Sequence, residues 1–480
     1  MTPSPKRWRL RGRFPDGALD GTAYPNLVRH LLWHRGLRTA SEADAFMDSH
    51  RLDYDPMLLP DAEPALDRLR AAIRDGETVA VYGDFDVDGV TASAILAEGL
   101  GELGARVTTY IPDRFSEGYG VNTAALDTLR SRGASLVVTA DCGTSSIEEI
   151  EHARTLGMDT IVVDHHTGPP LLPAAVAIVN PRRTGNLYPD PELAAGSLAF
   201  KLMSALYESL GRAWRPERYL DLVALSTVCD VAPLCGENRW LVKQGLKTLS
   251  RTERPGLRAL MDVAGVDPLR ADAGSIGFAL GPRLNAAGRL AHARLALDLL
   301  METDPDRAVL RARELSDLNQ QRQQATAAAM DLARDLLSEE EPGAPLIFIG
   351  HPHIPSGIVG LVAGRLAEEY YRPAVVYEQG DDTSRASCRS IPEFDITGAL
   401  LTCPDLMVRF GGHRAAAGFT VENAKLPALK DALRRQAADL LAGVDLVPII
   451  DVDAKVPLHR VNGSLIQSLA RLAPFGAGNP

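Results

Sequence analysis

The chain has 480 residues, of which 45% are hydrophobic and 24% are charged, and its formal net charge is −11. This length exceeds what one hydrophobic core usually supports, so we expect at least two domains, and the composition is that of a soluble globular protein without an apolar run long enough to span a membrane. The negative charge argues against nucleic-acid binding over the whole surface, because Lys and Arg provide most of the affinity for phosphates, and any such binding must use local patches.

The N-terminal segment is basic around Trp8, but no apolar segment follows it. We therefore expect no secretory signal and a cytoplasmic location. Trp8 could stack on a nucleic-acid base, although basic tails are more often simply solvated. The five cysteines are scattered and form no Cys-x-x-Cys pair, which argues against both a disulfide framework and a thiolate zinc site.

From residue 77 onward, short apolar runs alternate with segments of helical apolar spacing. The runs expected to be strands are 77–84, 106–112, 136–141, 160–164 and 176–180, and the helices between them are 91–103, 123–132 and 147–156. This alternation predicts an α/β domain with a parallel sheet covered on both faces. In such sheets, ligands bind outside the carboxyl ends of the strands.

A long helix is expected over 303–342, and it is polar over much of its circumference in its Gln-rich middle. Such a helix usually connects domains, and its apolar positions do not sustain the heptads of a coiled-coil dimer. Strands at 345–350, 373–377 and 418–421 and helices at 358–370 and 426–441 predict a second, smaller α/β domain. The predicted limits are an N-terminal extension over 1–45, a parallel-sheet domain over 46–302, the connecting helix over 303–342, the second domain over 343–443, and the first strands of a β domain over 444–480.

Three aspartates, Asp84, Asp86 and Asp88, follow the first apolar strand on alternate residues. Anions at this density repel one another unless cations bind. The pattern matches the opening of an EF-hand loop, but Ile95 at the twelfth position cannot provide the bidentate carboxylate, and a strand precedes the motif instead of a helix. Helix capping accounts for one aspartate but hardly for three.

Three further apolar segments also end in polar residues: Asp141 ends one, Asp164, His165 and His166 end the next, and Asp230 ends the last. Taken singly, Asp141 could cap a helix, His165 could be a core histidine, and Asp230 alone is weak evidence. Together they place carboxylates and imidazoles at neighbouring strand ends. This mixture suits Mn²⁺ or Mg²⁺, and two such ions about 3.5–4 Å apart can activate water and support an in-line displacement at phosphorus.

The Asp164-His165-His166 sequence with the upstream aspartates resembles the DHH phosphoesterase superfamily. The longer strings 82–89, 112–120 and 281–289 resemble the RecJ family of bacterial single-strand DNA exonucleases in particular. The resemblance runs from about residue 45 to the C-terminus. The string 411–418 is similar to the DHH-associated domain (DHHA1) that follows in this family.

The resemblance implies two ions of Mn²⁺ or Mg²⁺, with Asp141 bridging them. The implied ligands are Asp84, Asp86 and Asp141 for one ion, and Asp88, Asp141, His165 and Asp230 for the other. His166 would face the scissile phosphate, where a protonated imidazole neutralises developing charge. Asp164 would orient a histidine.

DNA contacts are implied in both domains. Arg283, Asn285 and Arg289 would grip the DNA backbone, because forked guanidinium groups match phosphate geometry. Their alternative reading is an ordinary surface loop with salt bridges. The candidates for binding the terminal nucleotide or 5′ phosphate are Ser387, Arg389, Ser390 and His413 in the second domain, with Arg114 of the first domain as a further phosphate contact.

The function implied by the resemblance is a 5′-to-3′ exonuclease of DNA repair and recombination that releases 5′ mononucleotides from a single strand threaded between the two domains. The implied partners are single-stranded DNA, a helicase and a single-strand-binding protein, and the protein is expected to be a monomer that binds no membrane. The chain stops after a Gly-Asn-Pro turn, where relatives continue into an OB-fold, so we expect an incomplete OB-like module and reduced processivity.

Two alternatives stay open. One is a phosphodiesterase of the same superfamily acting on oligoribonucleotides, cyclic dinucleotides or phosphorylated adenosine. Those smaller enzymes carry a histidine where this chain has Asp84, and they lack the 281–289 string. The other is a non-catalytic replication scaffold, against which every implied metal ligand is present here.

Overall fold

The computed structural model describes residues 5–48, 52–339 and 343–480. Contacts divide the chain into two compact units. One consists of residues 13–319 and 456–480, and the other of residues 1–12 and 320–455. Within the described ranges, no helix has both the length and the apolar character needed to cross a bilayer.

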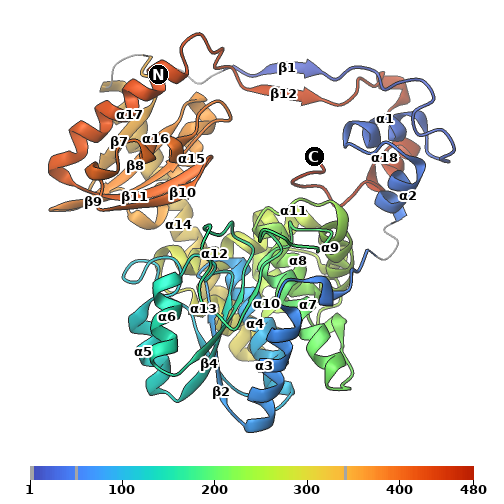
Figure 1. Cartoon of the computed structure of the whole chain (residues 1–480). Coiled ribbons are helices and arrows are strands. Elements are labelled where there is room, and N and C mark those ends of the chain that lie inside the picture. The colour runs from blue at the N-terminus through green and yellow to red at the C-terminus, as the bar shows by residue number, and fades with distance from the viewer. Residues whose placement is uncertain (1–4, 49–51, 340–342) are drawn as a thin grey trace. The chain divides into compact units, whose positions relative to one another are not determined.

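A five-stranded, all-parallel sheet forms the centre of the first unit (Figure 1), in the order β3-β2-β4-β5-β6. The strands are β2 (Thr78–Gly83), β3 (Arg106–Tyr110), β4 (Ala134–Ala140), β5 (Asp159–Val163) and β6 (Ala177–Val179). This confirms the predicted α/β class and parallel sheet. The chain moves from β2 to β3 on one side and then crosses to β4 on the other, so the order reverses between β2 and β4. A crevice for ligands is expected at this position.

Helices pack on the sheet and on one another, and they carry part of the candidate site. They are α3 (Ala62–Asp75), α4 (Val87–Glu102), α5 (Thr123–Ser131), α6 (Ile147–Thr155), α7 (Ala195–Ser209), α8 (Leu220–Cys229), α9 (Gly236–Leu249), α10 (Pro255–Ala264) and α13 (Arg294–Leu300). Most residues of α4 and α8 are buried, as expected for helices that are apolar all round. Because α4 packs against α7 and α8, the ends of these helices lie near the strand ends.

A further helix runs from Ala273 to Leu290 in three parts. A short α11 (Ala273–Ser275) passes into the π-turn η4 (Ile276–Leu280) and then into α12 (Gly281–Leu290). Asp272 caps its start in a capping box with Ser275. Single π-turns inside helices often occur at functional sites.

The N- and C-terminal segments of the first unit pack together. The helices α1 (Asn26–His34), α2 (Ala40–Asp48) and α18 (Gly463–Ala470) share a small apolar cluster that includes Leu32, Phe46 and Leu472. The buried guanidinium of Arg239 in α9 donates hydrogen bonds to the main-chain oxygens of Phe46, Leu472, Ala473 and Pro474. One buried cation thereby fastens both terminal segments to α9.

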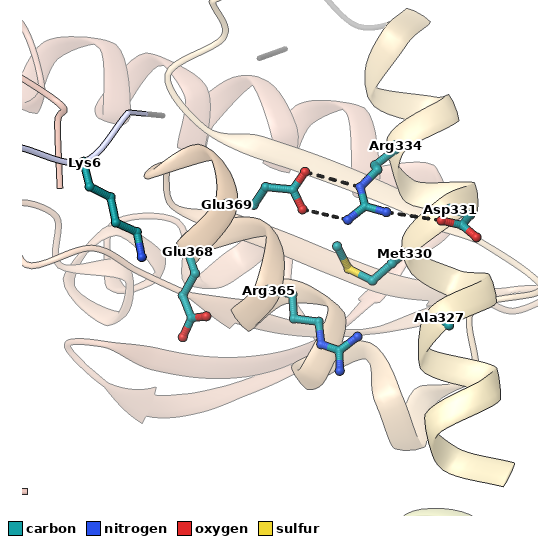
Figure 2. A pocket seen from close by; sticks show the side chains of 8 residues that line it. All are labelled: Lys6, Ala327, Met330, Asp331, Arg334, Arg365, Glu368 and Glu369. Atoms are coloured by element: carbon teal, nitrogen blue, oxygen red, sulfur yellow. Dashed lines mark hydrogen bonds and ion pairs between the residues drawn. The ribbon is translucent and has the colours of Figure 1, made fainter. Parts of the chain in front are cut away.

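The long helix predicted between the domains is present as α14 (Pro305–Glu339), which has 35 residues. Its predicted last residues, 340–342, lie outside the described residues. In its second half, Arg334 donates hydrogen bonds to Asp331 at 3.2 Å and to Glu369 of α15 (Ser356–Tyr370) at 2.9 Å (Figure 2). These residues line an open pocket of about 500 Å³, and the pair with Glu369 connects α14 to α15.

The second unit contains a mixed five-stranded sheet in the order β10-β11-β9-β8-β7 (Figure 1). Its strands are β7 (Ile347–His351), β8 (Ala374–Gln379), β9 (Thr383–Arg389), β10 (Arg409–His413) and β11 (Ala416–Glu422), and α15, α16 (Ile396–Leu401) and α17 (Leu426–Leu440) pack on it. Only β7 and β8 pair in parallel. The smaller α/β domain is therefore confirmed, with two strands, β9 and β10, that were not predicted.

The basic N-terminal segment forms β1 (Arg7–Leu10), which pairs with β12 (Ile449–Val452) in the second unit. Arg9 makes a two-bond ion pair with Asp451 at 2.6 and 2.9 Å, and Arg7 pairs with Asp445 at 2.8 Å. These carboxylates offset the positive charge that suggested a nucleic-acid patch around Trp8. The predicted start of a β domain contributes this one strand, and an OB-like module stays a prediction.

Candidate metal centre

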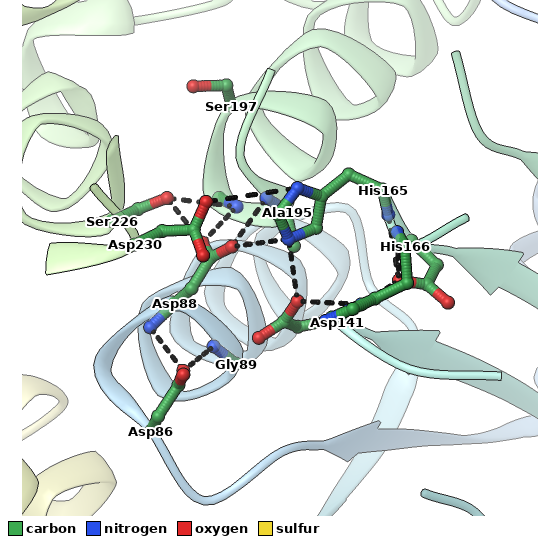
Figure 3. Close-up of polar contacts among 12 residues, drawn as sticks. Asp86, Asp88, Gly89, Asp141, His165, His166, Ala195, Ser197, Ser226 and Asp230 are labelled. Carbon is green, nitrogen blue, oxygen red and sulfur yellow. Dashed lines mark hydrogen bonds and ion pairs between the residues drawn. The ribbon is translucent and has the colours of Figure 1, made fainter. Parts of the chain in front are cut away.

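Polar loops meet at the carboxyl ends of three neighbouring strands (Figure 3). Asp84 follows β2, Asp141 follows β4, and Asp164, His165 and His166 follow β5. Because β2, β4 and β5 are adjacent and parallel, these loops share one edge of the sheet. They lie where the strand order reverses, as the sequence pattern predicts.

The side chains form three overlapping groups, and within each group the ligand atoms lie within 4.8 Å of one another. The groups are Asp84 with Asp86 and Asp141, Asp88 with His165 and Asp230, and Asp141 with His165 and His166. Asp141 and His165 each belong to two groups. The structure thus brings together every residue that the resemblance implied as a metal ligand.

Asp141 has an unusual backbone conformation, with φ at 66°. Its amide donates to the main-chain oxygen of Val163 at 3.0 Å, which ties the turn to β5. Such a conformation in a residue other than glycine costs about 1–3 kcal/mol and is typical of functional sites. Burial and the nearby carboxylates of Asp88 and Asp86 raise the pKa of Asp141 well above its ordinary value.

Asp88 is held by three donors. The amides of Ala195 and Gly196, at the start of α7, donate to it at 2.8 and 2.9 Å, and the hydroxyl of Ser226 in α8 donates at 2.5 Å. A helix N-terminus favours a carboxylate. A Cβ atom at Gly196 would lie 2.5 Å from the Ser226 oxygen, so only glycine fits this approach.

His165 faces carboxylates on both ring nitrogens. Its Nε2 lies 3.1 Å from Asp141 and 3.5 Å from Asp88, and its Nδ1 lies 3.9 Å from Asp230. Burial lowers the pKa of His165, which favours the neutral form that binds metals.

Two buried atoms of the cluster have no hydrogen-bond partner in the described chain, namely Nδ1 of His165 and Oδ1 of Asp84. Such groups are rare in folded proteins, and an ion is one of the explanations. Burial and repulsion from Asp86 raise the pKa of Asp84 well above its ordinary value. Two ligand atoms without hydrogen-bond partners, among carboxylates that repel one another, fit a pair of hard or borderline divalent cations.

Asp230 and Asp86 complete the cluster from two helices. Asp230 is the C-terminal cap of α8, and burial with repulsion from Asp88 and Asp86 raises its pKa to about 8. Asp86 caps α4 by accepting from the amides of Asp88 and Gly89 at 2.8 and 3.1 Å. Capping thus explains one of the three motif aspartates, as the sequence suggested.

Asp164 contacts His166, and the donors around its carboxylate leave few lone pairs for a cation. Its Oδ1 accepts from Nδ1 of His166 at 2.8 Å and from two amides, and its Oδ2 accepts from the amide of Thr144 at 3.0 Å. Burial disfavours the charged forms of both Asp164 and His166. The hydrogen bond and the opposite charges between the two side chains outweigh this effect, so the pKa of Asp164 is lowered and that of His166 is raised. The arrangement favours an imidazolium at His166.

Two glycines of the 281–289 string bring α12 to the cluster. A Cβ atom at Gly288 would lie 2.6 Å from the main-chain oxygen of Phe85, and one at Gly281 would lie 2.4 Å from the sulfur of Cys229. The helix therefore packs against the segments that carry Asp84 and Asp230. This places the half-buried Arg283, Asn285 and Arg289 on an element that adjoins the centre.

Arg114 also lies at the cluster. Its guanidinium sits 4.6 Å from the centre of the Phe85 ring. Burial lowers the pKa of Arg114, and the charges of Asp84 and Asp86 oppose this effect. A cation stacked on an aromatic face in this position is suited to an anionic ligand.

The candidates in the second unit fall into two sets. Arg389 donates to the hydroxyl of Ser387 at 3.0 Å, and both side chains pass close to Gly360 of α15. Strand pairing places His413 and Arg389 in one row with Ala416 between them, and so on one face of the sheet. Ser390 is separate, because its hydroxyl donates to the main-chain oxygen of Phe394 at 2.7 Å.

Comparison with known proteins assigns the chain to a family. The model of the DHH family, N-terminal domain, matches residues 78–227, and the DHHA1 domain model matches residues 343–439. The single-stranded-DNA-specific exonuclease RecJ of Salmonella typhimurium is 36% identical over 98% of this chain and 84% of its own length. The chain belongs to the RecJ family. RecJ of Escherichia coli is 38% identical over 87% of the chain and 76% of that protein.

A RecJ-family crystal structure, RecJ in complex with Mn²⁺ from Thermus thermophilus, superposes with a TM-score of 0.86 and 33% identity, covering 99% of this chain and 68% of that one. RecJ of Bacillus subtilis is 37% identical over the whole chain, but the chain spans only 61% of that relative. The comparisons therefore show the family and the fold of this chain, which spans only part of the length of these relatives.

Two residues that contact the centre, Ser226 and Tyr119, carry little signal in the sequence. Ser226 is a hydroxyl residue within an apolar helix, and its only signal in the sequence is its position four residues before Asp230. Tyr119 stands in the 112–120 string, and its hydroxyl lies 3.1 Å from Nδ1 of His166 and 3.2 Å from the main-chain oxygen of Asp141. The residue is 56% exposed.

Proposed function

We propose that this chain is a metal-dependent exonuclease that hydrolyses phosphodiester bonds of single-stranded DNA. One observation carries the proposal: Asp141 and His165 are shared between overlapping ligand groups at adjoining strand ends, as a pair of cations requires. Membership of a family whose relatives are named single-stranded-DNA-specific exonucleases supports the choice of substrate.

The proposed ligands are Asp84, Asp86 and Asp141 for one Mn²⁺ or Mg²⁺ ion, and Asp88, Asp141, His165 and Asp230 for the other. When bound, such ions polarise phosphate oxygens and lower the pKa of a bound water molecule, so that hydroxide is available as the nucleophile at neutral pH. Asp141 would bridge the two positions, and its fixed turn keeps its carboxylate between Asp84 and His165.

His166 acts on the substrate in this proposal. Held by Asp164 as an imidazolium, it lies beside Asp141 and neutralises charge that develops on the scissile phosphate. Tyr119 restricts the His166 ring through its hydroxyl. Arg114 stacked on Phe85, together with Arg283, Asn285 and Arg289, binds backbone phosphates, which gives affinity without reading sequence.

The second unit would bind the strand terminus. Arg389 with Ser387 and His413 provides cationic and hydroxyl groups on one sheet face for a 5′ phosphate, and Ser390 shapes the adjoining turn. Capture of that end gives 5′-to-3′ cleavage with release of 5′ mononucleotides. The proposal extends to action as a cytoplasmic monomer in DNA repair and recombination, with a helicase and a single-strand-binding protein as partners.

The test uses single-stranded DNA labelled at either end, a matched duplex, a short oligoribonucleotide and a cyclic dinucleotide, with Mn²⁺ or Mg²⁺. We expect mononucleotides from the 5′ end of single-stranded DNA, no product without metal, and slow reaction of the other substrates. Preferential cleavage of the cyclic dinucleotide would instead assign the chain to the small-substrate phosphodiesterases. Absence of cleavage together with absence of bound metal would support a scaffold.

A further inference from the structure

The first unit has a cavity that none of the proposed metal ligands lines. It has a volume of about 800 Å³ and is lined by α9, by the start of the Ala273–Leu290 helix, and by the C-terminal turn. Its lining includes Lys243, Lys247, Phe278 and Phe475.

The two phenylalanines are unusually exposed for apolar side chains. Phe278, in the π-turn, is 89% exposed, and Phe475 is 44% exposed. Exposed aromatic groups around a hollow mark interaction sites more often than scattered surface residues do. Flat, exposed rings of this kind are the usual platforms for unpaired nucleobases.

The charges around the cavity are suited to an anion. Lys243 and Lys247 lie one turn apart on α9 and both line it. Asp272 is the one carboxylate among the lining residues, and it accepts hydrogen bonds from the amide and hydroxyl of Ser275 at 2.7 and 2.8 Å. Its charge is thus engaged in capping. The ammonium of Lys243 donates to the main-chain oxygen of Met47 at 3.0 Å, and that of Lys247 donates to the side-chain oxygen of Gln244 at 3.4 Å. Both contacts are with neutral oxygens and hold the cations at the cavity.

The helix Ala273–Leu290 connects this cavity to the candidate centre. Phe278 lies on the cavity, and Gly288 packs on Phe85, next to Asp84 and Asp86. Ten residues of helix span about 15 Å. Fewer than five nucleotides cover this distance, even at the roughly 3.4 Å per nucleotide of a stacked strand.

We propose that this cavity is a second single-strand subsite, in which Phe278 and Phe475 stack on unpaired bases while Lys243 and Lys247 neutralise the adjoining phosphates. The proposal rests on the proposed function, and it adds a binding position about five nucleotides or fewer from the scissile bond. Its role is to retain longer strands, and very short strands do not reach it.

The test compares Phe278→Ala, Phe475→Ala and the double variant with the wild type. Binding of oligo-dT of three and of twenty nucleotides is measured by fluorescence anisotropy in Ca²⁺, with cleavage in Mn²⁺ recorded in parallel. Leu269→Ala is the matched control, because Leu269 is 85% exposed and does not line the cavity. Phe278→Ala removes mostly exposed surface and Phe475→Ala truncates a partly exposed side chain, so folding is expected to persist, and circular dichroism checks it.

We expect the Kd for the twenty-nucleotide strand to rise about tenfold or more in the Phe278→Ala and double variants, and the Kd for the trinucleotide to change less than about twofold. Equal Kd values in variant and wild type, with the wild type cleaving DNA, would overturn this inference alone. A wild type that neither binds nor cleaves single-stranded DNA would overturn the proposed function as well. Loss of affinity for an acidic, phenylalanine-containing peptide with unchanged strand affinity would assign the cavity to a protein partner and reject the subsite.

Discussion

The hydroxyl of Ser226 donates a 2.5 Å hydrogen bond to the Oδ1 atom of Asp88. Asp88 is almost fully buried, and two amides of α7 also donate to its carboxylate (Figure 3). These three donors leave a lone pair of Oδ2 for a cation. The orientation of one proposed ligand therefore depends on a serine in another helix. Groups that orient ligands in this way usually affect metal affinity nearly as strongly as the ligands themselves.

Replacing Ser226 with Ala should weaken Mn²⁺ binding about 10- to 100-fold, because Asp88 loses a donor that fixes it. Titration calorimetry on the chelator-treated protein measures this. Ser197→Ala is the matched control, since this buried hydroxyl near the start of α7 contacts Thr227 at 3.2 Å and does not reach Asp88. Equal losses in the two variants would show that Ser226 acts through general packing.

Replacing Asp141 with Ala should reduce cleavage of single-stranded DNA by more than about a hundredfold, because the change removes the ligand shared by both ion positions. DNA binding should persist, since the phosphate contacts lie on other side chains. Cleavage assays and anisotropy on the same preparation separate the two effects. Turnover at the wild-type rate would remove Asp141 from the bridging position.

Replacing Gly288 with Ala should push α12 away from the loop that carries Asp84 and Asp86. The added Cβ would lie 2.6 Å from the main-chain oxygen of Phe85. Overpacking of this kind costs about 1–3 kcal/mol of unfolding free energy, and we expect a matching fall in kcat. Gly101→Ala near the end of α4 has open space around the added atom and should lower neither quantity.

The metal-free protein should lose stability as the pH rises from 7 to 9. The folded state keeps a proton on Asp230, whose pKa is about 8, whereas the unfolded chain has already lost it near pH 4. The folded state therefore binds more protons, so the unfolding free energy falls with rising pH until this carboxyl ionises. The raised pKa values of Asp84, Asp141 and His166 act in the same direction.

Urea unfolding in chelator at several pH values between 7 and 9 measures this slope. Asp230→Asn should flatten it, because the amide does not titrate. Saturating Mn²⁺ should reverse the slope, since cations bind the ionised carboxylates. A metal-free protein whose stability rises over this range would contradict the cause given for the shift in the pKa of Asp230.

Much of the first unit could be predicted because its signals are local. Runs such as 136–141 are rich in β-branched residues and end in a polar group, and the rule for ligands in parallel sheets then places Asp84, Asp141 and His165 together. Ser226 and Tyr119 could not be found in this way. Their contacts with Asp88 and His166 come from packing between distant segments, which no periodicity records.

The second unit was less predictable. Strands β9 and β10 carry many polar and small residues, such as Ser384, Arg385 and Gly411, and they lack the alternating apolar pattern of a strand. These segments are strands because β9 pairs with β8 and β11, and β10 pairs with β11, which the local sequence does not indicate. The same pairing, and not spacing along the chain, places Arg389 and His413 on one face while Ser390 turns to Phe394.

The most direct test of the account is a crystal structure with Mn²⁺, read by anomalous scattering. Two peaks about 3.5–4 Å apart are expected, one among Asp84, Asp86 and Asp141 and the other among Asp88, His165 and Asp230, with Asp141 contacting both. A map without manganese at these carboxylates, from protein saturated with the metal, would contradict the proposed centre and the nuclease function that depends on it.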